Sequence, residues 1–290
     1  MTLVAPLNTG ADHRVDAPDK VSGRARYASE HPLDELVHVW PIGATVAKGE
    51  VRAVNDAVAL AEPGVLAVIT PGNAPRLNPV DDRELALFQS HAVAYRGQFV
   101  AAVVATTLET ARHAAEQVTV DYRRADHDVT LRADHPGLYA PDHVNPRYPT
   151  DVEVGDFDAA FGVAEVRVDA TYRTPGEHNN PMEPHATIAW WDGDQLTLID
   201  SNQGPAGVRN TLAQVFGLDR SQVRVVTEHV GGGFGSKGMP HPHVVLAAMA
   251  ARVVARPVKC ALARHHMFTV VGHRCPSIQR VRLGASADGR

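Results

Sequence analysis

The pattern of hydrophobic and polar positions predicts short strands and helices in alternation. Residues 97–105 form a continuous apolar run, GQFVAAVVA, which is typical of a strand covered on both faces. Residues 107–117 are rich in helix formers, and Thr106 or Thr107 is suited to cap the helix that they predict. Residues 118–122 alternate as a closing strand. We expect the crossover of this strand–helix–strand unit to be right-handed.

The second half of the chain predicts a similar mixture of elements. Residues 165–173 alternate cleanly, which predicts a strand with one solvated face. The pair Asp192-Gly193 indicates a hairpin, while Pro205 and Gly217 suit the two ends of a helix. Further strands are expected at 185–191, 196–200, 222–226 and 258–262, and helices after Asp156 and at 205–216 and 242–254. Together these elements predict an α+β fold class.

Composition excludes several classes of protein. The net charge of −5 gives no reason to expect nucleic acid or an anionic membrane as a partner, and no apolar run is long enough to span a bilayer. The N-terminal segment lacks the pattern of a secretory signal. Cys260 and Cys275 form no CxxC pair, and we interpret them as two free thiols. We therefore expect a cytoplasmic protein, although a partner carrying an export signal is also compatible with the sequence.

Acidic residues are absent between Glu228 and Asp288. The same stretch carries eight basic residues: Lys237, Arg252, Arg256, Lys259, Arg264, Arg274, Arg280 and Arg282. One interpretation is a basic surface on an acidic protein, and the other is a pocket for a strongly anionic ligand. We favour the pocket, because a glycine-rich loop lies in the same stretch.

That loop, residues 230–238, reads VGGGFGSKG between a predicted strand and a predicted helix. Glycines permit positive φ, and successive amides beside a helix start can hold an oxo-anionic or phosphate-bearing cofactor. The loop lacks the Walker pattern and the GxSxG nucleophile elbow. It matches GxGxxG formally, but no acidic residue follows at the distance that a dinucleotide fold requires. An NAD-dependent dehydrogenase is therefore the weaker interpretation.

The sequence resembles the molybdenum-binding (large) subunit of the xanthine dehydrogenase/aldehyde oxidase family. The similarity rests on residues 16–30, 97–122, 179–218, 230–238 and 264–276, and is strongest to bacterial aldehyde-oxidising members. The resemblance implies an α/β hammerhead domain at 14–125, a linker at 126–150, and the first, incomplete part of a mixed α/β molybdopterin-binding domain at 151–290. The implied cofactor is molybdopterin in a dinucleotide form.

The resemblance also implies roles for particular residues. Gln203 matches the family glutamine whose amide contacts an oxygen ligand of molybdenum, and Gly204 beside it lets the cofactor approach. Phe234 matches the residue whose backbone N–H contacts another ligand of the metal, with Gly232, Gly233 and Gly235 shaping the loop. No protein side chain is expected to bind the metal directly, because the dithiolene of the pterin holds it. We reject a metal site for His241, His243, His265, His266 and His273.

One departure from the family is the general base, a glutamate in a Gly-x-Gly-Glu context, which does not occur here. No catalytic residue is therefore assigned. Gly238-Met239 stands where purine-oxidising members carry an acid, which favours aldehydes or related N-heterocycles as substrates. Expected partners are an iron–sulfur subunit, an FAD subunit and a chain supplying the missing C-terminal half. Asp288-Gly289 predicts a turn into a further strand, so we expect a truncated subunit that is inactive alone. The alternative is a non-catalytic remnant or assembly fragment without cofactor.

Overall fold

The computed structural model describes residues 14–145 and 148–289. The described parts of residues 1–127 and 179–272 form one compact unit, and residues 128–178 with 273–289 form another. The first unit thus combines segments that the sequence assigned to two domains. The expected boundaries, 14–125, 126–150 and 151–290, stay a prediction. The N-terminal segment 1–13, in which no secretory signal was found, lies outside the described residues, as do 146–147 and 290.

A seven-stranded sheet forms the centre of the first unit, in the order β12-β11-β10-β13-β1-β5-β3. Its strands are β1 (Val37–Gly43), β3 (Val65–Ile69), β5 (Phe99–Ala105), β10 (Ala186–Asp192), β11 (Gln195–Asp200), β12 (Val223–Val226) and β13 (Val258–Ala261). The strands before and after residue 179 meet at β1 and β13, which pair in parallel. One sheet therefore crosses from the first sequence region into the second.

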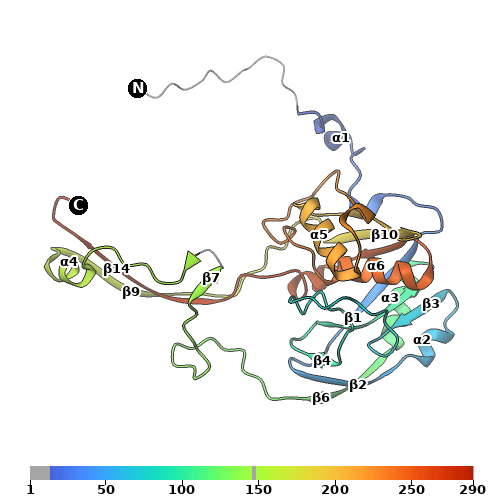
Figure 1. Cartoon of the computed structure of the whole chain (residues 1–290), viewed down its shortest axis with the longest axis horizontal. Coiled ribbons are helices and arrows are strands. Elements are labelled where there is room, and N and C mark those ends of the chain that lie inside the picture. Colours follow the sequence, from blue (N-terminus) through green and yellow to red (C-terminus); the bar gives the residue numbers. More distant parts are fainter. Residues whose placement is uncertain (1–13, 146–147, 290) are drawn as a thin grey trace. The chain divides into compact units, whose positions relative to one another are not determined.

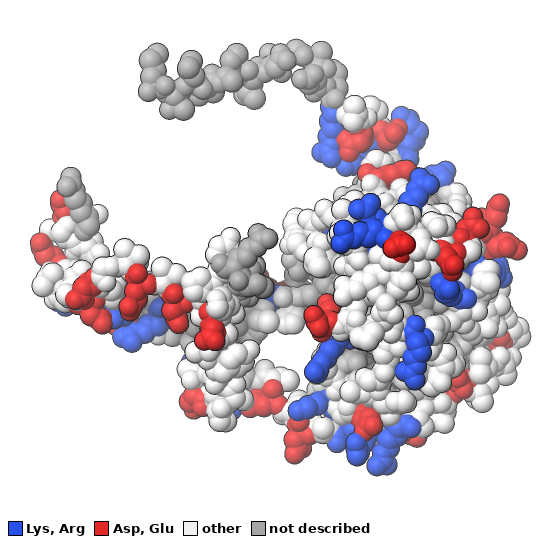
Figure 2. Space-filling view, viewed as in Figure 1, with Lys and Arg blue, Asp and Glu red and all other residues white. Residues whose placement is uncertain are grey.

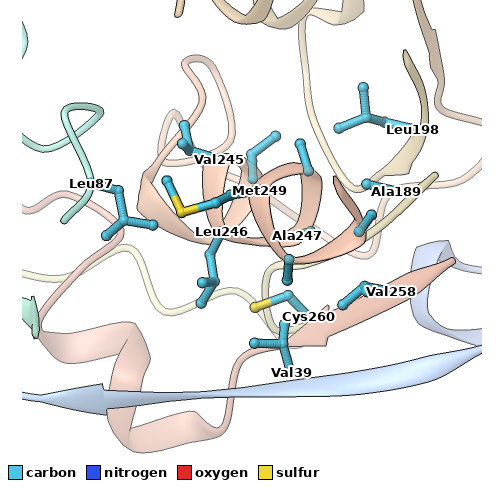
Figure 3. Packing of buried hydrophobic residues seen from close by; sticks show 14 of the residues in the cluster. Val39, Leu87, Ala189, Leu198, Val245, Leu246, Ala247, Met249, Val258 and Cys260 are labelled. Carbon is cyan, nitrogen blue, oxygen red and sulfur yellow. The ribbon is translucent and has the colours of Figure 1, made fainter. Parts of the chain in front are cut away.

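Helix α6 (Pro242–Val254) supplies the core of this unit and packs against β1, β3, β10, β11 and β13. Ten of its thirteen residues are buried, and a helix that is apolar on all sides belongs in an interior. Figure 3 shows Leu246 and Met249 of this helix among side chains of the sheet, including Val39, Val258 and Cys260. The predicted helix at 242–254 is confirmed.

A second, three-stranded sheet, in the order β4-β2-β6, belongs to the same unit. Its strands are β2 (Gly49–Asn55), β4 (Ala92–Val93) and β6 (Thr119–Arg124). Helix α3 (Leu108–Gln117) connects β5 to β6 and is capped by Thr107, whose side chain accepts a hydrogen bond from the Thr110 amide. The expected right-handed crossover is wrong, because β5 and β6 lie in different sheets and no parallel pair connects them.

Local turn and cap signals predicted the neighbouring elements well. β10 and β11 form the expected hairpin, with Gly193 at φ +56°. Helix α5 (Pro205–Phe216) begins and ends where expected, and Gly217 adopts the left-handed conformation at its C-terminus. The remaining short elements of the first unit are α1 (Ala17–Val21), η1 (Ala28–Glu30), α2 (Ala57–Ala61), η2 (Arg220–Gln222) and η3 (Arg264–Phe268).

The second unit is built on a two-stranded ribbon of β9 (Val166–Thr174) and β14 (Ser277–Ala285), which run side by side in Figure 1. It also holds α4 (Phe157–Val163), capped by Asp156 as expected, and the short strands β7 (His143–Asn145) and β8 (Tyr148–Pro149) within the predicted linker. The alternation in β9 predicted one buried face. This is wrong for the described residues, since every residue of β9 except Ala170 is exposed.

Among the described residues, none of the helices combines the length and the apolar character that crossing a membrane requires. The longest helix, α6, has thirteen residues, and about 20 are needed to cross a bilayer.

Removing the side chain of Leu246 should test how much of the fold depends on α6. Leu246 is fully buried in the core, so Leu246→Ala is expected to lower the free energy of unfolding by about 2–5 kcal/mol. Val253, on the same helix, is 41% exposed, and Val253→Ala should cost less than about 1 kcal/mol. Denaturant unfolding of both variants measures the difference. Equal losses would show that α6 does not organise the core.

Candidate functional site

The glycine loop between β12 and α6 has an unusual backbone. Gly232, Phe234 and Gly235 all adopt positive φ, at +94°, +53° and +95°. Two tight turns follow one another, because the Ser236 amide donates to the Gly233 carbonyl at 2.9 Å and the Gly238 amide donates to the Gly235 carbonyl at 3.1 Å. The loop is thus a compact series of turns held by its own backbone.

Gln203, which follows β11, lies against this loop. Its side-chain Oε1 accepts a hydrogen bond from the Gly235 backbone amide at 3.0 Å. The backbone N–H of Gln203 donates to the Lys237 carbonyl at 2.7 Å. A Cβ on Gly233 would lie only 2.4 Å from Gln203 Oε1, so only glycine allows this approach. The structure therefore brings together the side chain and the loop that the resemblance paired.

Several hydrogen-bond donors at this place have no acceptor among the described residues. They are the amides of Gly232, Gly233 and Phe234 and the side-chain Nε2 of Gln203. Gly233 is buried, whereas the Phe234 side chain is 72% exposed. The Phe234 carbonyl is occupied by Asn179 Nδ2 at 2.6 Å. Donors gathered on a loop of positive-φ residues suit an anionic, oxygen-rich group.

A buried ion pair lies beside the loop. Lys237 Nζ donates to Glu183 Oε2 at 2.8 Å, to the Glu183 carbonyl at 3.0 Å and to Ser201 Oγ at 2.8 Å. The Lys237 side chain is fully buried. Burial lowers the pKa of Lys237, and Glu183 opposes that shift. Sequence reasoning missed this pair, because it interpreted Lys237 only as part of a basic surface or of a pocket for an anionic ligand.

A second buried carboxyl group lies at the end of β11. Asp200 accepts hydrogen bonds from Thr187 Oγ1 at 2.5 Å and Asn202 Nδ2 at 2.8 Å, yet burial raises its pKa to about 6. Asn202 also accepts from the Gly204 amide at 3.0 Å and donates to Thr227 Oγ1 at 2.9 Å. Asn202 therefore fixes the backbone on both sides of Gln203.

Three histidines, His185, His241 and His243, lie close together beside the loop. The Nε2 atoms of His185 and His241 lie 3.2 Å and 2.7 Å from the Ser236 carbonyl, so each must carry a hydrogen to donate. The His185 ring also lies 5.3 Å from the His243 ring. Within the described part of the chain, no group of three or more His, Cys, Asp or Glu side chains could bind a metal ion. The rings of His185 and His241 therefore support the loop at the Ser236 carbonyl.

Two family models together match most of the chain. Residues 22–126 match the family model for the aldehyde oxidase and xanthine dehydrogenase a/b hammerhead domain, and residues 139–290 match that for the molybdopterin cofactor-binding domain. The chain belongs to the aldehyde oxidase and xanthine dehydrogenase family. The expected fold class, a hammerhead region followed by part of a molybdopterin-binding region, is confirmed.

Family relatives include the aldehyde oxidoreductase molybdenum-binding subunit PaoC of Escherichia coli K12, 39% identical over 279 residues. The xanthine dehydrogenase molybdenum-binding subunit of Escherichia coli O157:H7 is 30% identical over 292 residues. These matches cover 96% and 95% of this chain but only 38% and 39% of the relatives. The chain therefore spans well under half of their length.

Two solved structures share the fold. Quinoline 2-oxidoreductase from Pseudomonas putida 86 has a TM-score of 0.80 at 23% identity, covering 96% of this chain and 37% of its own. Aldehyde oxidoreductase from Desulfovibrio gigas has a TM-score of 0.77 at 24% identity, covering 95% and 32%. At these identities the likeness shows the fold alone.

The cations of the acid-free stretch were expected to line a pocket for an anionic ligand. On the face drawn in Figure 2, Lys and Arg side chains are interspersed with Asp and Glu. The cations of the acid-free stretch divide between the two units and bind partners from elsewhere in the sequence. Their contacts are Lys237 with Glu183, Arg252 with Asp194, Arg256 with the Glu35 carbonyl, Lys259 with the Ser29 carbonyl, Arg280 with Asp169 and Arg282 with Asp158. Most of these cations thus already have partners within the protein, because a stretch without acids in sequence is not without acids in space. A pocket for an anionic ligand stays a prediction.

Burial of His185 should make the fold sensitive to acid. The pKa of His185 is lowered from 6.5 to about 3, mainly by burial; the hydrogen bond to Ser236 opposes the shift, and His241 and Lys237 add to it. Below about pH 6.5 the His185 imidazole is protonated in the unfolded chain but stays neutral in the folded chain. The free energy of unfolding should therefore fall by roughly 2 kcal/mol between pH 7 and pH 5 through this residue alone.

The variant His185→Gln keeps a donor towards the Ser236 carbonyl but cannot be protonated. It should therefore remove the part of the pH dependence of the free energy of unfolding that His185 contributes. Urea unfolding at both pH values, with exposed His113→Gln as control, measures it. An unchanged pH dependence in His185→Gln would contradict the assignment.

Proposed function

We propose that this chain forms part of the molybdopterin-holding wall of a molybdenum hydroxylase that oxidises aldehydes with water as the oxygen source. The observation that supports this most is the set of donors without acceptors: three loop amides and Gln203 Nε2. The pterin dithiolene carries the metal, and the bound cofactor supplies the redox chemistry. The protein must therefore offer hydrogen-bond donors more than metal ligands, and this site offers donors.

Each site residue then has a task of its own. Gln203 would donate from Nε2 to an oxygen atom of the cofactor, while its Oε1 accepts from the Gly235 amide and holds it in place. Gly233 leaves room for Gln203. The Phe234 amide adds a second donor, and its exposed ring supplies apolar surface beside it. Gly232, Gly235 and Gly204 allow the backbone to come close. The residues present thus fit an oxo-anionic group.

The substrate and the partner subunits are proposed from the similarity to relatives and from the family resemblance. Aldehydes are favoured by the similarity to PaoC, and by Gly238-Met239 standing where the family resemblance places an acid in purine-oxidising members. An iron–sulfur subunit and an FAD subunit would accept the electrons, as the resemblance implies. A dinucleotide form of the pterin, a cytoplasmic location, a complementing chain and inactivity of these residues alone stay predictions. Aldehyde-dependent dye reduction by the purified chain would contradict the last of these.

Gly233→Ala tests whether the close approach at the loop matters for cofactor binding. The added methyl group must displace Gln203, so the charge-assisted hydrogen bonds to the cofactor should weaken. The cofactor content of the purified chain should then fall about tenfold or more. Molybdenum per chain is measured by mass spectrometry after production in a host that makes the cofactor. Gly207→Ala in α5, where a Cβ meets open space, is the matched control. Equal molybdenum in the two variants would refute the role of Gly233.

Gln203→Glu separates the two functions of the glutamine. A carboxylate still accepts from the Gly235 amide but has no donor for the cofactor. We expect molybdenum content to fall strongly while hydrogen exchange at the loop stays near that of the wild type. Gln214→Glu, on the exposed face of α5, adds the same charge nearby as a control. Full molybdenum content in Gln203→Glu would show that Nε2 holds no cofactor.

A further inference from the structure

The Lys237 ammonium is completely used by the protein. It has three N–H donors, and three acceptors lie at 2.8–3.0 Å: Glu183 Oε2, the Glu183 backbone carbonyl and Ser201 Oγ. Its side chain is fully buried. Lys237 therefore cannot reach a ligand, although it lies within the glycine loop.

The partner, Glu183, connects further parts of the site. Its Oε2 also accepts from the Gly231 amide at 2.6 Å and from Ser201 Oγ at 2.7 Å, and its amide donates to the Gly231 carbonyl at 3.1 Å. A Cβ on Gly231 would lie 2.5 Å from Glu183 Cβ, so this contact also requires glycine. The carboxylate thus holds the start of the loop, and the ammonium holds its end.

The same pair reaches the segment that carries Gln203. Ser201, two residues before Gln203, bonds to both the Glu183 carboxylate and the Lys237 ammonium. The backbone N–H of Gln203 donates to the Lys237 carbonyl at 2.7 Å. Both ends of the loop and the strand end are therefore tied to one buried pair. The distance between Gln203 and the loop amides is set by these bonds.

Stability does not account for the pair. Taking two charges out of water costs about as much as their attraction returns, and apolar replacements of buried pairs are often neutral or stabilising. Asp200 is a further buried carboxyl group nearby, and it acts on Lys237 with the same sign as Glu183. A geometric role explains why a buried lysine stands in a loop otherwise built of glycine and small residues.

We propose that Glu183 and Lys237 are positioning residues whose buried ion pair fixes the glycine loop against Gln203. The effect on the loop is a property of the protein alone. Its consequence for cofactor binding rests on the proposed function. In the absence of the pair, the loop keeps its glycines but loses the bonds that align its donors with Gln203 Nε2.

The test uses Lys237→Met, Glu183→Gln and the double variant in the 290-residue chain. Either single change leaves one buried group without its charged partner, so both should lower the denaturation midpoint. The double variant should recover most of that loss because no buried charge is left alone. Lys259→Met removes a half-buried lysine on β13 that is bonded to the Ser29 carbonyl, and is the matched control.

The deciding measurement is hydrogen exchange in the loop peptide, residues 228–240, followed by mass spectrometry. Exchange should rise about tenfold in Lys237→Met and stay raised in the double variant despite its recovered stability, since the bridging cation is absent. Exchange in β5 and in Lys259→Met should match that of the wild type. Wild-type exchange of the loop in the double variant would overturn the proposal.

Molybdenum content separates this inference from the proposed function. If the wild type binds molybdenum, the double variant should bind about tenfold less, in proportion to the lost loop order. Full molybdenum content together with fast loop exchange would overturn the positioning role. A wild type without any molybdenum would contradict the proposed function, and the exchange result would still decide whether the pair orders the loop.

Discussion

Parallel pairing of β11 with β12 is the constraint on which the site depends. Leu196 pairs with Val223 and Ile199 with Val226, so both strands end at the same edge of the sheet. The segment that carries Gln203 leaves one strand there, and the glycine loop follows the other. The carboxyl ends of parallel strands are where open α/β sheets bind ligands. The position of the site thus follows from strand register before any side chain is considered.

Antiparallel β10 and β13 bring further parts to that edge. Ala186 pairs with Ala261, so the segment before β10 and the segment after β13 meet beside the loop. The first delivers Glu183 and the second delivers Arg264, which donates to the Pro181 and Met182 carbonyls. Arg264 is exposed, whereas the Glu183–Lys237 pair at this edge is buried. Such a buried pair is costly, and Glu183 Oε2 and Lys237 Nζ each have several partners that offset the cost.

Local signals in the sequence predicted the elements, and distant pairings escaped prediction. Helix α5 was correct at both ends because Pro205 and Gly217 restrict the backbone at the point where they stand. The joining of β1 to β13 had no such signal, since register between distant strands depends on the whole sheet. Glu183 and Lys237 are 54 positions apart in the sequence, so no local pattern predicted that they form an ion pair. The role of Gln203 was predicted only from family resemblance, because a single glutamine after a strand does not by itself indicate a binding site.

The loop itself shows how strain and bracing belong together. Phe234 holds a left-handed backbone at φ +53°, which costs a residue with a side chain roughly 1–2 kcal/mol. Bonds on both sides resist its relaxation: Asn179 holds its carbonyl, and Gln203 holds the next amide. Such a conformation leaves the Phe234 amide without an internal acceptor and its ring in solvent. A loop needed only as a turn would place glycine there, so the retained side chain and the free amide both argue for a ligand.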